Sequence, residues 1–494
     1  MKIKYIYILM LISYIVLYGC KEESKNVINE EIRLPNIVLF LADDMTWRDC
    51  EPYGNPDVKT PNIQKLADEG VCFDNMFTST AMCAPTRQQL MTGLFPVRNG
   101  AFPNHSEVYD GVKSFGHYFG ELGYKVALIG KQHYGPDESF PIEYLGGRQH
   151  DDGKNGVDID LKKTQKIING DKPFFLIIAQ NQPHSPWNRG NPEQYNTEEL
   201  DIPEYMVDVS LTRESLTKYY AEITYMDSLL GKTLNYVDVA DKTDNTISIF
   251  TSEQGYYYPF GKWTNYDLGL KTAFIAKWPG KIKPKTRNKA MTQYVDIVPT
   301  LLDAIGVDYE KINTGISDAK GNMGFDGKSF LQAFLGNTEK HRNYTFGVQT
   351  TRGIFYGPET YPIRSIRSEK YRYIQNLSHE VFFKNMITEN HEIYKTWLAN
   401  SDEHEADWIK RYQKRPFEEL YNLDNDPFEK HNIVENPEME NVKKELSNEL
   451  KTWMEQQGDE GLATEMRALG RQHVIKKGHP GIISHNQKVK QGDN

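Results

Sequence analysis

The chain has 494 residues, enough for about two to four domains or for one large α/β domain with an appendage. Hydrophobic residues make up 38% of it, charged residues 26% and aromatic residues 12%, which excludes a disordered or fibrous protein. Lys and Arg number 58 against 68 Asp and Glu, and the resulting net charge of −10 gives no electrostatic reason to expect nucleic-acid binding. An anionic ligand would have to be attracted by local cations.

Residues 1–20 have the layout of a secretory signal, with Lys2 and Lys4 before an apolar stretch that is too short for a membrane span. The segment ends in Leu-Tyr-Gly-Cys and resembles a bacterial lipoprotein signal, in which Cys20 carries the lipid. Residues 21–34 would then be a polar tether. We expect an exported protein, in the periplasm or anchored at the outer membrane or cell surface. A cleaved signal without lipid and an uncleaved anchor are the alternatives.

Four apolar runs in the N-terminal half are strand-like, alternate with helical patterns and end in polar residues. This alternation predicts an α/β fold with a mostly parallel sheet and helices on both faces. Ligands bind outside the carboxyl ends of the strands in such sheets, so we expect these polar residues to converge on one crevice. The runs and their polar followers are 36–42 with Asp43 and Asp44, 125–130 with Lys131 and His133, 173–179 with His184, and 246–251 with Glu253 and Gln254.

Helices are expected between these strands. Thr60 and Pro61 open one as N-cap and first-turn proline, and Gly70 closes it. A longer helix over 215–234 places large apolar and aromatic residues at helical spacing, and we interpret them as core. They are Tyr219, Tyr220, Ile223, Met226 and Leu230.

The pattern changes in the C-terminal half. A further helix begins near Asp296, residues 362–373 alternate like an antiparallel strand, and residues 442–454 are helical. We predict a main catalytic domain over 35–360 and a smaller C-terminal α+β subdomain over 361–494 that packs on the main sheet.

Cys83 lies in the most specific local string of the chain, Cys-Ala-Pro-Thr-Arg at 83–87. Pro85 suits the first turn of a helix, so Cys83 would lie at a helix N-terminus, where backbone N–H groups and the dipole favour an anion. From residue chemistry alone, Cys83 is either a thiolate nucleophile of low pKa or an inert buried thiol. Cys50 and Cys72 could form a disulfide, but two buried thiols are the more ordinary expectation.

The string C-x-P-x-R, with Thr-Gly at 92–93, resembles the sulfatase signature, and further segments match motifs of that family in the same order. On this resemblance the chain is identified as a sulfatase, which implies an alkaline-phosphatase-like fold and hydrolysis of sulfuric esters. The matching segments are 36–44 with its Asp pair, Gly-Lys-Gln-His at 130–133, Pro-His-Ser-Pro at 183–186, Thr-Ser-Glu-Gln-Gly at 251–255, Gly-Lys-Trp at 261–263 and Glu-Leu-Tyr-Asn-Leu at 419–423.

Four residues at the expected strand ends offer only hard oxygen ligands, which suit Ca²⁺ or Mg²⁺ better than zinc. They are Asp43, Asp44, Glu253 and Gln254. The resemblance favours one Ca²⁺ and adds Cys83 to the ligand set. The family more commonly has Asp-Asn in place of Glu253-Gln254, so a shift of backbone or metal must absorb the two extra methylenes.

The resemblance also implies roles for the residues around the sulfate. A formylglycine-generating maturation enzyme would oxidise the signature cysteine to formylglycine (3-oxoalanine), which acts as the nucleophile. Lys131 and Lys262 would offset charge on the sulfuryl oxygens, and Arg87 would hold the formylglycine alkoxide. His133 would be the base for breakdown of the sulfated intermediate, and His184 the acid that protonates the leaving group.

The substrate is less closely defined. Residues 36–135 and 346–377 look most similar to heparan N-sulfoglucosamine sulfohydrolase, which implies a sulfated polysaccharide; an exported bacterial enzyme could equally act on algal ulvan. Arg364 and Arg367 could bind a neighbouring uronate or sulfate, or simply form an exposed strand face. The alternatives to a sulfatase are a phosphodiesterase or phosphonate hydrolase on a related fold and an inactive glycan-binding lipoprotein.

Overall fold

The computed structural model describes residues 33–147, 159–358 and 360–471. The expected signal over 1–20, its Cys20 and nearly all of the expected tether over 21–34 lie outside the described residues. The described residues from Pro35 onward form one compact unit. Among the described residues, no helix is both long enough and apolar enough to cross a membrane.

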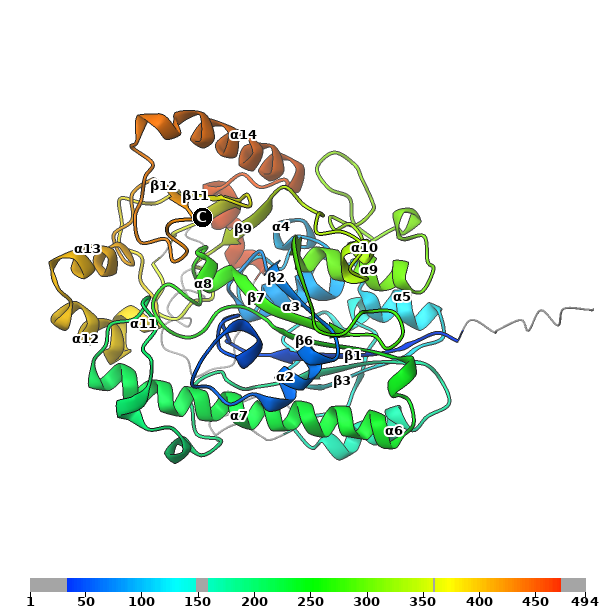
Figure 1. The fold of residues 1–494 in the computed structure, drawn as a ribbon. Helices are drawn as coiled ribbons and strands as arrows, with labels where there is room; N and C mark the ends of the chain where they lie inside the picture. Colours follow the sequence, from blue (N-terminus) through cyan, green and yellow to red (C-terminus); the bar gives the residue numbers. More distant parts are fainter. Residues whose placement is uncertain (1–32, 148–158, 359, 472–494) are drawn as a thin grey trace, which may run out of the picture. The chain divides into compact units, whose positions relative to one another are not determined.

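The strands of the described residues form two sheets (Figure 1). They are β1 (Asn36–Ala42), β2 (Val71–Phe77), β3 (Lys125–Gly130), β4 (Glu143–Tyr144), β5 (Phe174–Ala179), β6 (Thr246–Ser252), β7 (Lys271–Lys277), β8 (Thr286–Gln293), β9 (Thr345–Gln349), β10 (Ile363–Arg367), β11 (Tyr371–Asn376) and β12 (Glu418–Asn422). The larger sheet has the order β4-β3-β5-β1-β6-β7-β2-β8, and the smaller one β12-β11-β10-β9.

The larger sheet is mostly parallel, as the sequence predicts. In its described strands only β7 runs against its neighbours, pairing antiparallel with β6 and β2. The four predicted apolar runs become β3, β5, β1 and β6, which lie next to one another in the middle of the sheet. Every residue of β1, β5 and β6 is buried, which explains why β1 and β5 read as continuous apolar runs; in β6, small Thr and Ser residues share the buried positions with apolar ones. Their carboxyl ends therefore meet at one edge.

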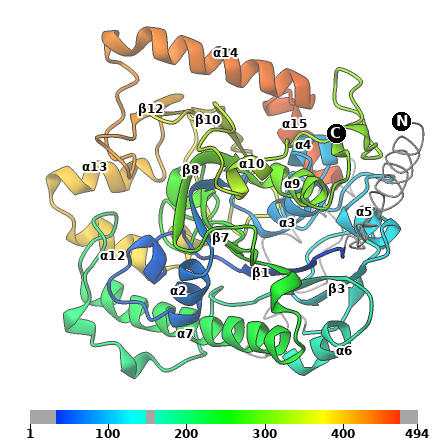
Figure 2. The same ribbon diagram turned by 45° about the vertical axis from the view of Figure 1, so that its right-hand side comes forward.

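Helices cover both faces of this sheet (Figures 1 and 2). The α-helices of the described chain are α2 (Pro61–Asp68), α3 (Cys83–Thr92), α4 (Pro96–Asn99), α5 (Phe115–Glu121), α6 (Gln165–Ile168), α7 (Ser210–Val239), α8 (Asp267–Leu270), α9 (Ile297–Ala304), α10 (Leu331–Phe334), α11 (Met386–Glu389), α12 (Glu392–Asn400), α13 (Glu403–Arg411), α14 (Glu440–Gln457) and α15 (Leu462–Arg467). Helices α2, α6 and α7 lie on one side of the sheet, and α3, α5 and α9 lie on the other.

Helix α7 confirms the predicted long helix and is longer than expected at both ends. Its five predicted core residues, named above, are all buried, and they pack in one cluster with Val38 and Phe40 of β1. Thr60 precedes α2 as predicted, but its side chain makes no cap. Its hydroxyl accepts a hydrogen bond from the backbone N–H of Glu51 instead, at 2.9 Å.

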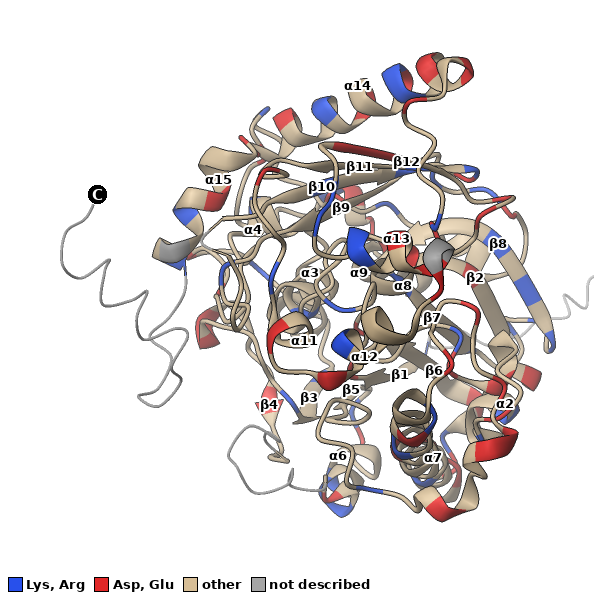
Figure 3. Ribbon diagram, turned by 90° about the vertical axis from the view of Figure 1, so that its left-hand side faces the viewer, with Lys and Arg blue, Asp and Glu red and all other residues tan. Residues whose placement is uncertain are grey.

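The smaller sheet begins earlier in the chain than the predicted boundary at 360/361. Strand β9 precedes that boundary, yet it pairs antiparallel with β10 in the smaller sheet. The residues predicted as a single strand, 362–373, form a hairpin of β10 and β11. Ser368 and Tyr371 are hydrogen-bonded to each other, and the chain turns between them at Glu369 and Lys370. Helix α14 packs on this sheet through Leu446, Leu450 and Trp453, and its charged residues are visible along the ribbon in Figure 3.

The two described cysteines outside the expected active site, Cys50 and Cys72, are buried thiols. Cys50 and Cys72 are not joined by a disulfide in the described chain. Burial raises the pKa of Cys72 to about 11, so this thiol stays protonated at neutral pH.

The packing of α14 on the smaller sheet predicts a large destabilisation by Trp453→Ala. The Trp453 ring stacks on Phe346 with centroids 4.8 Å apart and meets Phe95 edge-on at 5.1 Å. Losing it should lower the free energy of unfolding by about 3–5 kcal/mol, measured by urea denaturation. Lys451→Ala is the control on the same helix, because the Lys451 side chain is 77% exposed. Equal midpoints for the two variants would contradict this packing.

Candidate active site

Backbone hydrogen bonds continue the sheet ladder past the strand ends and fix the residues that follow. The N–H of Asp43 donates to Gln182 O at 3.0 Å, that of Lys131 to Ala179 O at 2.9 Å, and that of Glu253 to Ala42 O at 2.9 Å. These bonds place the side chains after β1, β3 and β6 at one edge of the sheet, where the sequence predicts them.

Glycines at two of these strand ends allow the close packing. A Cβ on Gly130, where φ is +102°, would lie 1.9 Å from Ala179 O. A Cβ on Gly255 would lie 1.8 Å from Leu268 O. Any larger residue would push apart the backbone next to Lys131 or Gln254.

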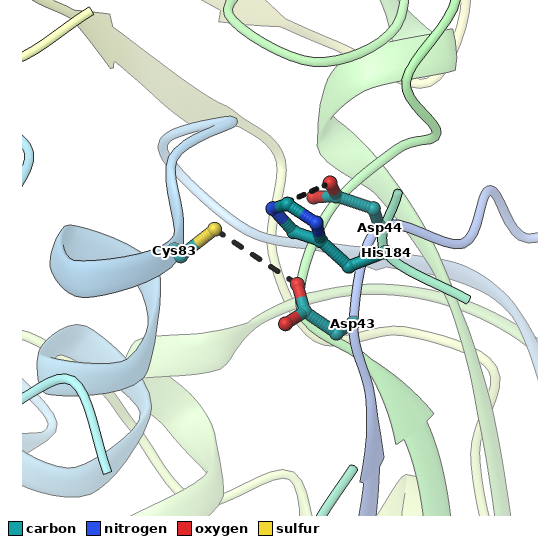
Figure 4. Close-up of side chains that lie close together, drawn as sticks. All are labelled: Asp43, Asp44, Cys83 and His184. Carbon is teal, nitrogen blue, oxygen red and sulfur yellow. Dashed lines mark hydrogen bonds and ion pairs between the residues drawn. The ribbon is translucent and has the colours of Figure 1, made fainter. Parts of the chain in front are cut away.

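Cys83 is the first residue of α3 and points toward the residues that follow β1 (Figure 4). Its Sγ lies 3.9 Å from Asp43 Oδ1 and 3.4 Å from Gln254 Nε2. Burial, and next the charge of Glu253, raise the pKa of the Cys83 thiol well above its usual range. An unmodified Cys83 is therefore a neutral thiol, which argues against the hypothesis of a low-pKa thiolate.

Arg87 lies one helical turn after Cys83 and its guanidinium is fully buried. Its Nε donates to Glu253 Oε2 at 2.5 Å, its Nη1 donates to Lys131 O at 2.9 Å, and its Nη2 lies 3.7 Å from Asp43 Oδ2. The side chain thus joins the ends of three strands to the helix that carries Cys83.

Each of the two adjacent aspartates is paired with a lysine. Lys131 Nζ lies 2.5 Å from Asp43 Oδ2, and Lys262 Nζ lies 2.6 Å from Asp44 Oδ2. Burial alone would raise the pKa of Asp43, but Lys131, with smaller contributions from its other neighbours, outweighs it and holds that pKa well below its usual range. Burial alone would lower the pKa of Lys262, but the neighbouring Asp44 outweighs burial and raises that pKa well above its usual range. The Lys131–Asp43 pair is therefore charged at neutral pH, and so is Lys262, while burial raises the pKa of Asp44 above its usual value.

The two aspartates also belong to a group that fits a divalent ion. Single ligand atoms of Asp43, Asp44, Cys83 and His184 all lie within 4.8 Å of one another. Gln254 adds a buried Oε1 that has no hydrogen-bond partner among the described residues, while its Nε2 donates to Asp44 Oδ1 at 2.6 Å. Glu253 is less available as a ligand, because its Oε2 accepts from Arg87 and its Oε1 accepts from Gln254 at 3.0 Å.

His184 and His133 approach this group from two different loops. His184 Nδ1 lies 2.6 Å from Ser185 O, an acceptor, so Nδ1 carries a proton and the other nitrogen, Nε2, lies 3.4 Å from Asp44 Oδ2. His133 Nε2 lies 2.9 Å from Nδ1 of His105. Burial, and then His105, lower the pKa of His133 well below its usual range, so His133 is neutral.

Comparisons with known proteins agree with this geometry. The sulfatase family model matches residues 35–307, and the model described as N-sulphoglucosamine sulphohydrolase, C-terminal, matches residues 253–378. An ulvan-active sulfatase of Formosa agariphila is 34% identical over 467 residues, covering 93% of this chain and 86% of that protein. The chain belongs to the sulfatase family. It is therefore a sulfuric ester hydrolase, and its expected alkaline-phosphatase-like fold is confirmed.

More distant relatives of this sulfatase share the fold. Human N-sulphoglucosamine sulphohydrolase is 26% identical, covering 85% of this chain and 89% of that protein. A structure solved with its substrate D-glucosamine-2-N,6-O-disulfate is 20% identical and covers 87% of this chain and 99% of that one, with a TM-score of 0.63. A 2-O GAG sulfatase, 18% identical, covers 86% of this chain and 93% of that one at a TM-score of 0.64.

Arg364 and Arg367 of the sulfatase do not lie where the sequence analysis expects them. Neither forms an exposed strand face, because both side chains are buried. The Arg364 guanidinium pairs with Asp459 through Nε and Nη2, and its Nη1 donates to Gln349 O at 3.1 Å. Arg367 Nε lies 3.2 Å from Asp267 Oδ1. Both arginines are engaged by buried carboxylates and hold the smaller sheet to its neighbours, which favours a structural role over the predicted binding of substrate.

Sequence reasoning missed His105 and Asn104, which lie between α4 and α5. Asn104 Oδ1 accepts from the backbone N–H of Ala84 at 3.3 Å, and Asn104 Nδ2 lies 3.2 Å from His105 Nε2. The two residues thereby connect α3 to His133. No strand end or family motif marks them, so only the contacts reveal them.

The structural role of Arg364 predicts that Asp459→Ala is strongly destabilising. It would leave a guanidinium buried without its carboxylate, which should cost about 3–5 kcal/mol of the free energy of unfolding. Asp424→Ala is the control, because Asp424 pairs with Lys370 at the exposed surface. Urea denaturation measures both, and KM for an aryl sulfate should be unchanged in either variant. Unchanged stability together with a raised KM in Asp459→Ala would restore the substrate-binding hypothesis.

Proposed function

We propose that this sulfatase removes sulfate from sugars of a sulfated polysaccharide of the ulvan or the heparin/heparan type, using formylglycine made from Cys83 and one Ca²⁺. The observation that carries the proposal is the position of Cys83. Its side chain lies at the N-terminus of α3, against Asp43 and Gln254, in a buried site that holds three cationic side chains. A helix N-terminus with fixed cations around it suits an anionic, sulfated group.

Modification of Cys83 accounts for a nucleophile at this position. Unmodified Cys83 is a neutral thiol, and a neutral thiol is a poor nucleophile. Hydrated formylglycine supplies two hydroxyls, one of which displaces the alcohol from sulfur, while loss of the proton from the other expels sulfate and restores the aldehyde. Thr86 donates to Glu253 O at 3.1 Å and so holds the first turn of α3 against the end of β6.

The cations around Cys83 are already oriented before substrate arrives. Lys131 and Lys262 are held by Asp43 and Asp44, and Arg87 by Glu253. Their side chains need little rearrangement to stabilise charge that develops on sulfuryl oxygens, which is the most effective form of electrostatic catalysis. Removing Lys131 or Lys262 should lower kcat by about 10²–10³-fold.

The two histidines supply groups for proton transfer. The nearby carboxylate of Asp44 favours a proton on His184 Nε2, and we assign His184 as the acid that protonates the leaving group. The sequence predicts His133 as the base of the second step. Whether His133 can accept a proton there depends on which of its ring nitrogens is already protonated, and its hydrogen-bonded neighbours determine that.

Calcium is the metal that we propose for this site. Asp43, Asp44 and Gln254 would hold it through oxygen atoms, and Glu253 would take part only if Arg87 released it. A bound Ca²⁺ would supply positive charge for a sulfate oxygen and for the nucleophile. The flexible geometry that Ca²⁺ accepts tolerates the longer side chains at 253 and 254 better than the strict octahedron of Mg²⁺.

The relatives support the two polysaccharide classes. One is named an ulvan-active sulfatase and another an N-sulphoglucosamine sulphohydrolase. The signal-like residues 1–20 support export with a lipid anchor on Cys20. The signature string at 83–87 supports maturation by a formylglycine-generating enzyme.

The proposed nucleophile predicts a specific change of mass at Cys83. When the protein is co-produced with a formylglycine-generating enzyme, the peptide that contains Cys83 should lose one sulfur and two hydrogens and gain one oxygen. The matured enzyme should release sulfate from heparin-derived or ulvan-derived oligosaccharides, and Cys83→Ala should not. Cys72→Ala is the control, a buried thiol outside the site. Faster turnover of an aryl phosphate than of an aryl sulfate would contradict the proposal.

The proposed metal predicts a stabilisation that does not depend on turnover. Ca²⁺ at a hundred times its Kd should add about 2.7 kcal/mol to the stability of the wild type, seen as a higher Tm. The shift should be lost in Asp44→Asn and kept in Asp424→Asn, which changes an exposed aspartate. EDTA should abolish sulfate release, and Ca²⁺ should restore it better than Mg²⁺. A Tm that does not respond to either ion would exclude this site.

A further inference from the structure

A chain of hydrogen bonds runs from α3 to His133 through two residues to which no role has yet been assigned. The backbone N–H of Ala84, next to Cys83, contacts Asn104 Oδ1 at 3.3 Å. Asn104 Nδ2 contacts His105 Nε2 at 3.2 Å, and His105 Nδ1 contacts His133 Nε2 at 2.9 Å. The two imidazole rings lie 4.8 Å apart between centroids.

The direction of every bond in this chain follows from its first member. A backbone N–H can only donate, so the Asn104 atom that faces Ala84 must be the oxygen. The amide nitrogen then faces His105 and donates to Nε2, which must be unprotonated. A neutral His105 carries its proton on Nδ1 and donates it to Nε2 of His133. A neutral His133 therefore carries its own proton on Nδ1.

The surroundings of His133 support the neutral state that this reasoning needs. Burial, then His105, Lys131 and Arg87 lower the pKa of His133, and Asp43 opposes them with a smaller effect. His133 Nδ1 is buried and has no hydrogen-bond partner among the described residues. The N–H that the chain of bonds assigns to Nδ1 is thus still available to a ligand.

The backbone holds both histidines in an unusual conformation. His105 has φ of 58° and His133 has φ of 54°, in the left-handed region that non-glycine residues seldom adopt. Such conformations persist where the surrounding structure holds them, and they are concentrated at functional sites.

We propose that Asn104 and His105 are positioning residues that fix His133 as its Nδ1–H tautomer, so that His133 meets the reacting groups as a hydrogen-bond donor. This rests on the proposed function, in which His133 borders the nucleophile. In this tautomer His133 donates to an oxygen of the nucleophile or of the sulfuryl group. It cannot be the base of the second step unless its tautomer changes, which would break its bond to His105.

Two substitutions at position 105 separate this role from a purely structural one. His105→Asn keeps an N–H near the position of Nδ1 and should preserve the tautomer of His133. His105→Asp places an acceptor there, so His133 should move its proton to Nε2 and lose the donor that faces the site. The side chains are nearly the same size, so both variants test hydrogen bonding at similar packing.

The direct measurement is ¹⁵N NMR of the full-length protein labelled only at histidine, with His133→Gln to assign the His133 signals. We expect a protonated Nδ1 and an unprotonated Nε2 in the wild type and in His105→Asn, and the reverse in His105→Asp. A wild-type His133 protonated on Nε2 would overturn the proposal. This readout needs no turnover, so it remains decisive even if no sulfated substrate is hydrolysed and the proposed function fails.

Kinetics on an aryl sulfate give the second readout. Loss of a donor used in the transition state should lower kcat of His105→Asp by about 10²–10³-fold with little change in KM, while His105→Asn retains most of the activity. Equal losses in the two variants, with both still folded by their Tm, would also overturn the proposal, because they would show that the direction of the hydrogen bond does not matter.

Discussion

The carboxylate of Asp43 is completely buried, and the surrounding site is arranged to keep it charged. An isolated carboxylate in such a place would take up a proton, because burying its charge without a partner would cost its free energy of hydration. Lys131 and Arg87 prevent this, and they arrive from β3 and α3, far apart in sequence. The ion pairs therefore require the sheet, the helix and the strand ends to be assembled together. Removing any one partner would leave the others as uncompensated buried charges.

The same arrangement prepares the site for an anion. Three carboxyl groups, on Asp43, Asp44 and Glu253, lie against three cations, on Lys131, Lys262 and Arg87. Burial raises the pKa of Glu253 to about 8 and that of Asp44 above its usual value, so the carboxyl groups offset the three positive charges only in part. A divalent cation would add positive charge that a sulfate ester can neutralise. Substrate would thus be attracted by the loaded site far more than by the empty one, in a protein whose overall charge of −10 repels it.

The sequence predicts the parts of this structure that follow from local pattern. The strand-like runs, their mostly parallel direction and the polar residues at their ends could be predicted, because strands buried on both faces are largely apolar and parallel strands end at the same edge of a sheet. Arg364 and Arg367 could not be assigned in this way. Their partners, Asp459 and Asp267, lie about a hundred residues away in the sequence. An arginine in an alternating strand gives the same sequence pattern whether its side chain faces solvent or pairs with a buried carboxylate.

Three further features depend on contacts that the pattern does not encode. Strand β9 belongs to the smaller sheet only because β10 pairs with it. The hairpin after Arg367 depends on a turn through Glu369 and Lys370, which interrupts the alternation only briefly. His105 is functional, in our proposal, through the direction of a hydrogen bond, and that direction is set by Ala84 on another element.

The smaller sheet has a part in the active site although none of its residues lies there. Lys262 is followed within a few residues by Asn265 and Asp267, and the smaller sheet and the segment after it hold this stretch. Arg372 of β11 donates to Asn265 O at 2.8 Å and pairs with Asp267, while Glu429 accepts the backbone N–H of Asp267 at 2.7 Å. At the other end, the N–H of Trp263 donates to Ala81 O at 2.9 Å, two residues before Cys83.

These contacts explain why the C-terminal Glu-Leu-Tyr-Asn-Leu segment and the glutamate that follows it accompany the catalytic motifs in one chain. Glu419 of that segment accepts from Tyr266 at 2.8 Å, beside the residues that Arg372 and Glu429 hold. The Lys262 loop is thus fixed to the smaller sheet on one side and to the Cys83 turn on the other. A long, flexible lysine can pair with the buried Asp44 only if its backbone is held at the right distance. In the proposed mechanism, the smaller sheet would therefore contribute to catalysis by fixing the position of the Lys262 ammonium group.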